Sequence, residues 1–162
     1  MFIVGDKIVY PMHGAGIIEE IEEKKILGET RRYYILRVPC GDMKIMIPIE
    51  SSDGVGVRNV MTELELGDVI DSLQGATTEM SNNWNRRYRE NMEKLKTGDA
   101  FEVAEVVRNL MRLDKEKKLS TGEKKMLSNA KQILQSEMIL VKDIDIITAA
   151  DIIERTVNFN LS

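Results

Sequence analysis

Side chains suited to nucleophilic catalysis are scarce in this sequence. His13 is the only histidine and Cys40 the only cysteine, so a Cys–His nucleophilic pair would have to use both. A zinc site normally takes four Cys, His or carboxylate ligands at close spacing, and the sequence offers no such group. It also contains neither G-x-x-x-x-G-K nor G-x-G-x-x-G, the glycine-rich loops that bind phosphates. We therefore predict no enzymatic activity, no cofactor and no metal site.

A second set of residues is suited to contact with nucleic acid. Trp84 is the only tryptophan, and three arginines follow it within five positions: Arg86, Arg87 and Arg89. An indole can insert at a distorted base step while arginines hold the flanking phosphates. A lone tryptophan is more often a core or staple residue. Here its flanks are polar and cationic rather than apolar, which favours the DNA contact.

The charges are unevenly distributed along the chain. The formal net charge is -4 and the sequence pI about 5.2, which argues against a protein that coats DNA electrostatically. Residues 84–125 nevertheless hold twelve basic and eight acidic side chains, a local net charge of +4. Such a segment can be a solvated helix face with i,i+4 ion pairs, or a patch for phosphates that includes Lys124 and Lys125.

The N-terminal residues, up to about position 58, have the pattern of β-structure. Short β-rich runs alternate with turn signals at Pro11, Leu27-Gly28-Glu29, Gly41-Asp42 and Pro48. Four or five strands in so short a segment predict a small barrel or a strongly bent antiparallel sheet of Tudor size. So small a unit has a limited core and should lean on the rest of the chain or on a partner.

From residue 59 onward the periodicity becomes helical, and the chain resembles a bundle of about five helices. Thr62 with Glu65 and Ser120 with Glu123 fit capping boxes. Further helices are expected at about 84–96, from residue 99, and from Thr148 with Asp151 in its first turn. The predicted fold class is thus α+β, with a sheet domain at 1–58 and a helical domain at 59–162.

Composition bounds the cellular setting. The 162 residues are 43% hydrophobic and 31% charged, as expected of a folded protein rather than a disordered one. One cysteine excludes an intrachain disulfide, the N-terminus lacks the apolar core of a signal peptide, and no stretch has the ~20 apolar residues of a membrane span. We expect a soluble cytoplasmic protein.

Four segments resemble the CarD/CdnL family of bacterial transcription factors, in order and at matching spacing over residues 2–140. They are 4–14 (VGDKIVYPMHG), 84–99 (WNRRY followed by EKLKTGD), 103–110 (VAEVVRNL) and 119–127 (LSTGEKKML). The opening motif is shared with the polymerase-interacting domain of transcription-repair coupling factors. Those proteins carry a helicase motor that is missing here.

The resemblance implies that the N-terminal domain binds the β subunit of RNA polymerase by extending its sheet at one edge with a strand of the partner. Lys24 and Met46 match the family positions that help this contact, and Ile45 and Ile47 could pack against the partner. Relatives often have arginine where Met46 stands, and methionine cannot form a bidentate contact with a carboxylate. The polymerase contact here is therefore expected to be weaker or differently composed.

The resemblance also implies that the helical domain faces promoter DNA. Trp84 matches the tryptophan that wedges into the minor groove at the upstream edge of the transcription bubble. Arg86, Arg87 and Arg89 fall where phosphate contacts are expected, and Lys124 and Lys125 are further candidates. The protein is then a regulator that stabilises the open promoter complex, as a monomer on polymerase, with a domain-swapped dimer also open.

Three other functions remain open from the sequence. The same fold could be a polymerase-bound adaptor that recruits another factor through its helices, without a DNA wedge. An unrecognised enzyme would need a pocket with convergent polar groups. A sequence-specific DNA-binding protein should bind promoters without polymerase, which the acidic pI disfavours.

Overall fold

The computed structural model describes residues 1–159. Within this range, the N-terminal part of the chain forms one antiparallel sheet of five strands. The strand order is β4-β3-β2-β1-β5, with bounds Lys7–Tyr10 (β1), Gly14–Ile26 (β2), Glu29–Val38 (β3), Met43–Pro48 (β4) and Arg58–Asn59 (β5). β4 pairs only with β3, and β5 only with β1, so the two edges do not meet. The α+β class is confirmed, and the sheet is open rather than closed into a barrel.

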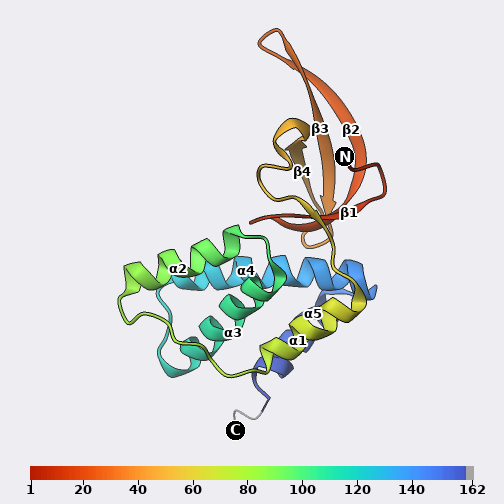
Figure 1. The fold of residues 1–162 in the computed structure, drawn as a ribbon. Coiled ribbons are helices and arrows are strands. Elements are labelled where there is room, and N and C mark those ends of the chain that lie inside the picture. Colours follow the sequence, from red (N-terminus) through yellow and green to blue (C-terminus); the bar gives the residue numbers. More distant parts are fainter. Residues whose placement is uncertain (160–162) are drawn as a thin grey trace.

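The β2–β3 hairpin is the longest part of the sheet and projects away from the helices (Figure 1). Ile26 pairs with Glu29, which leaves Leu27 and Gly28 as a two-residue turn with φ of 50° and 81°. Positive φ at both positions is the type I′ turn that matches the twist of a hairpin. The predicted turn is therefore confirmed, although leucine is an uncommon residue at its first position.

Within residues 1–159, five helices follow the sheet, as predicted. They are Glu63–Leu73 (α1), Trp84–Lys96 (α2), Ala100–Glu116 (α3), Thr121–Lys142 (α4) and Ile146–Val157 (α5). The predicted cap of α1 is complete, because Thr62 accepts from the Glu65 amide while the Glu65 carboxylate accepts from the Thr62 amide. Asn83, Asp99 and Ser120 cap the next three helices.

Two of the predicted helix starts need correction. α5 begins at Ile146 rather than Thr148, because Asp145, three residues before Thr148, caps the helix by accepting from the Thr148 amide at 2.7 Å. That hydrogen bond also holds the pKa of Asp145 below its usual value. At α4 only half of the predicted capping box is present. Ser120 accepts from the Glu123 amide, but the Glu123 carboxylate binds Arg87 instead.

Each part of the chain has its own apolar core. The smaller core lies in the sheet and includes Ile8, Ile18, Tyr34, Leu36 and Ile47. The larger one fills the bundle with residues from all of α1–α5. Ile139 on α4 packs against both cores. The small sheet therefore leans on the bundle, as its size led us to expect.

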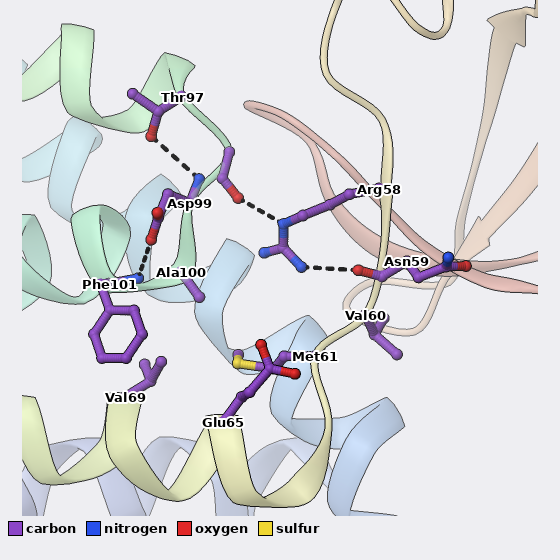
Figure 2. Close-up of a pocket in the computed structure, with 11 residues that line it drawn as sticks. Arg58, Asn59, Val60, Met61, Glu65, Val69, Thr97, Asp99, Ala100 and Phe101 are labelled. Atoms are coloured by element: carbon purple, nitrogen blue, oxygen red, sulfur yellow. Dashed lines mark hydrogen bonds between the residues drawn. The ribbon is translucent and has the colours of Figure 1, made fainter.

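The sheet and the bundle are joined by polar contacts along α4. Arg58, on the short strand that spans the predicted domain division, donates to both carboxylate oxygens of Glu137 at 2.8 and 2.9 Å. Glu137 also accepts from the Met61 amide at 2.9 Å. Arg58 Nε donates to the Gly98 carbonyl (Figure 2). A further contact joins β2 to α4, where the Ala15 amide donates to Ser136 Oγ at 2.8 Å.

Candidate nucleic-acid interface

Trp84 is the first residue of α2, and its position follows from the local sequence. Asn83 caps the helix by accepting from the Arg86 amide at 3.0 Å. The indole stacks on Tyr88, one turn further along, with ring centroids 5.3 Å apart. Trp84 is 43% exposed, so it is neither a core residue nor a free side chain. Its exposed part is available to a partner.

The N-terminus of α4 lies directly against that of α2, although the two are far apart in sequence. Trp84 Nε1 donates to Ser120 Oγ at 2.8 Å. Arg87 donates to both carboxylate oxygens of Glu123, each at 2.7 Å. Helix N-termini carry partial positive charge and free amide groups, so two adjacent ones favour an anion such as phosphate.

Arg87 differs from the other predicted phosphate contacts in being largely buried and paired. Its side chain is 15% exposed, and that of Glu123 only 2%. The two hydrogen bonds that Arg87 donates to the Glu123 carboxylate raise the pKa of Arg87 above its usual value. Arg87 also donates to the Ser81 carbonyl. In this structure Arg87 is thus committed to holding α2, α4 and the preceding loop together.

The remaining predicted DNA contacts are exposed on the two helices that meet at Trp84. Arg86 forms an exposed i,i+4 ion pair with Glu90 at 2.8 Å, which costs little to open. Arg89, Lys124 and Lys125 are exposed and form no ion pair with another residue of 1–159. Four exposed cations therefore remain available on the two helices whose N-termini meet at Trp84.

Three of the predicted polymerase-binding residues lie on the free edge strand β4, and the fourth, Lys24, does not. Met46 is exposed, Ile45 is half-buried and Ile47 is fully buried in the sheet core. Ile47 can thus offer a partner its main chain but not its side chain. Lys24 is exposed on β2, where it pairs with Arg31 of β3. β3 separates it from β4, and the pairing between β3 and β4 ends before this point, at Tyr33 with Pro48.

Ion pairs connect β2, β3 and β4 on the sheet surface next to this edge. Glu19 on β2 pairs with Arg37 on β3 and with Lys44 on β4, the latter at 3.3 Å. The Arg37 guanidinium is the main reason that the pKa of Glu19 lies below its usual value. Lys44 is therefore engaged within the sheet, and Met46 is the exposed side chain nearest the middle of the edge.

Two findings on the described chain bear on other functions. Among residues 1–159, no three His, Cys, Asp or Glu side chains gather in a way that could hold a metal ion. Within the same range, no helix combines the length and apolar character needed to cross a bilayer.

The division into an N-terminal sheet and a C-terminal helical bundle agrees with the comparisons with known proteins. A family model described as CarD-like/TRCF RID domain matches residues 2–61, and one described as CarD, C-terminal domain matches residues 68–154. The chain therefore belongs to the CarD family of transcription factors. It is similar to the Bacillus subtilis (strain 168) protein "Putative transcription factor YdeB". The two are 46% identical over 144 residues, which is 89% of this chain and 94% of that protein.

The sequence did not reveal what holds the indole. Ser120 was predicted as a cap, and Glu123 as its partner in a capping box. Their contacts with Trp84 and Arg87 join positions 36 residues apart. The capping-box pattern identified Ser120 and Glu123 as residues with a polar role. Their spacing in the sequence does not indicate that the start of α2 lies against this end of α4.

Proposed function

We propose that this transcription regulator binds the β subunit of RNA polymerase through the β4 edge and stabilises the open promoter complex through Trp84. The observation that carries the proposal is the exposed indole where two helix N-termini meet, on helices that also expose Arg86, Arg89, Lys124 and Lys125. Inserted at the upstream edge of the bubble, the ring would fill the space left by an unstacked base step, and the cations would contact the flanking phosphates.

The mechanism needs only a small energy. If the wedge favours the open over the closed complex by ~1.4 kcal/mol, the ratio of their populations rises about tenfold. The protein acts by binding alone, with no catalytic step. Because closing the bubble must first expel the indole, we expect the effect mainly in the rate of open-complex collapse.

Polymerase binding reconciles this role with the acidic composition. A net charge of -4 disfavours binding to free DNA. A domain delivered by polymerase meets its site at a high effective concentration and needs little affinity of its own. The free edge of β4 can add a strand from the β subunit by main-chain hydrogen bonds, and the exposed Met46 adds a side-chain contact on that strand. Lys24, on β2, would contact the subunit beyond the end of β4. The site of action is then the cytoplasm, with polymerase on the nucleoid.

The lifetime of open complexes on a ribosomal-type promoter tests the proposal, with holoenzyme from the source bacterium and wild-type protein, Trp84→Ala or no factor. We expect wild type to lengthen the lifetime and Trp84→Ala to lose most of the effect while binding the β subunit equally well. Phe101→Ala is the matched control, since Phe101 is also exposed near the start of a helix but lies beyond the opposite end of α2. Equal lifetimes for wild type and Trp84→Ala would favour the adaptor function instead.

A further inference from the structure

Ser120 performs two functions with one oxygen atom. Its hydroxyl oxygen accepts from the Glu123 amide at 3.3 Å, which caps α4, and from Trp84 Nε1 at 2.8 Å. A hydroxyl oxygen has two lone pairs, and these two donors use both. The cap fixes Ser120 relative to α4, so the indole is bonded to a point that is itself held in place.

Two packing contacts define the plane of the indole. One face of the ring stacks on Tyr88 at an interplanar angle of 23°. The edge that carries Cζ2 lies over Gly122, where an added Cβ would be 3.5 Å from that atom. The edge containing Nε1 and Cζ2 is therefore turned towards α4, and the exposed part of Trp84 lies away from it.

The Arg87–Glu123 pair fixes the distance between the two helix starts. Both side chains are almost withdrawn from solvent, and the two hydrogen bonds are parallel, as in a bidentate carboxylate contact. Arg87 is three positions after Trp84 and Glu123 three after Ser120. Each helix thus contributes one member to the Trp84–Ser120 contact and one to the ion pair a turn further on.

We infer that Ser120, supported by the Arg87–Glu123 pair, is a positioning residue that sets the orientation of the Trp84 indole before DNA is bound. This inference rests on the proposed DNA contact of Trp84. A side chain that is already fixed loses little conformational freedom on docking, whereas a mobile one would lose that freedom in the complex. Removing the Ser120 hydroxyl should therefore shorten the open-complex lifetime about two- to tenfold, with Trp84 itself still present.

The first test is the motion of the indole in the free protein, because Trp84 is the only tryptophan and reports alone. Ser120→Gly removes the acceptor but largely preserves the cap, since glycine is tolerated at N-caps. We expect a larger amplitude of nanosecond fluorescence depolarisation for Ser120→Gly at unchanged helicity, and recovery in Ser120→Thr. Thr62→Gly is the control, because Thr62 caps α1 through the same hydroxyl contact and does not touch Trp84. Unchanged indole motion in Ser120→Gly would overturn the inference.

The second test is the open-complex lifetime with the same variants and holoenzyme. Ser120→Gly should shorten it, Ser120→Thr should restore it, and Thr62→Gly should behave as wild type. If Trp84→Ala shortens the lifetime and Ser120→Gly does not, the positioning role is wrong and the proposed function stands. If Trp84→Ala has no effect, the proposed function itself fails, and the inference fails with it.

Discussion

The contact between Arg58 and Glu137 predicts a large and asymmetric effect on stability. The Glu137 side chain is 4% exposed and that of Arg58 is 31% exposed. Arg58→Met keeps the aliphatic stem but leaves a buried carboxylate whose remaining hydrogen bond comes from the Met61 amide. Breaking a buried pair costs about 3–5 kcal/mol, and we expect about 3 kcal/mol because the site is open on the arginine side. Glu137→Gln should cost about 1–2 kcal/mol, since the arginine left behind can reach water.

The double variant separates this explanation from a simple loss of contacts. Arg58→Met combined with Glu137→Gln contains no unpaired charge, and the amide oxygen introduced by the second substitution can still accept from the Met61 amide. We expect the double variant to lose no more free energy of unfolding than Arg58→Met alone. The two single effects would then sum to about 1–2 kcal/mol more than the double effect, and this difference is the coupling energy. The assay is urea unfolding followed by far-UV circular dichroism, with the free energy of unfolding extrapolated to water.

An exposed ion pair provides the control for this cycle. Arg155 and Asp151 form an i,i+4 pair on α5 whose side chains are mostly exposed. Arg155→Met should change the free energy of unfolding by no more than about 0.5 kcal/mol. If Arg58→Met costs under about 1 kcal/mol, or if the two junction substitutions add, the desolvated carboxylate is not the cause and the reasoning is refuted.

Three further predictions concern backbone conformation, and all are read from the midpoint of urea unfolding. Gly122→Ala should stabilise the protein by about 0.5–1 kcal/mol, because the new methyl group lies in ordinary contact with Trp84 and alanine favours the helix; no gain would mean that the first turn of α4 is strained. Gly98→Ala should instead destabilise it by about 1–3 kcal/mol, since φ is 71° and the methyl group would lie 2.8 Å from Pro11 Cγ; a neutral result would contradict that close approach. Leu27→Asn should stabilise the hairpin by about 1 kcal/mol, because Leu27 is 99% exposed at φ 50°, where asparagine is favoured; a loss of stability would show that the leucine side chain is held by contacts in the folded state.

Local signals predicted much of this fold. Caps such as Asn83 and Thr62 act within three residues, so their spacing in sequence is their spacing in space. The hairpin turn at Gly28 was predicted for the same reason. Asp145 was missed because Thr148, with Asp151 three residues after it, offered a second plausible cap three residues later, and local spacing does not distinguish the two caps.

The candidate site was less accessible from sequence because its contacts are long-range. Arg87 stands in a basic run, and only the fold shows that it forms an ion pair with Glu123, 36 positions away. The sequence does not say which face of β4 packs against the core, so Ile47 was predicted to pack against a partner although its side chain is buried. The exposure of Trp84 likewise depends on how α2 meets α4.

α2 is held at both of its ends. At the C-terminal end Gly98 lies against Pro11 and its carbonyl accepts from Arg58. At the N-terminal end the Trp84–Ser120 and Arg87–Glu123 contacts join the helix to α4. A displacement that begins at the junction with the sheet can therefore reach the indole only if the N-terminus of α4 moves with it.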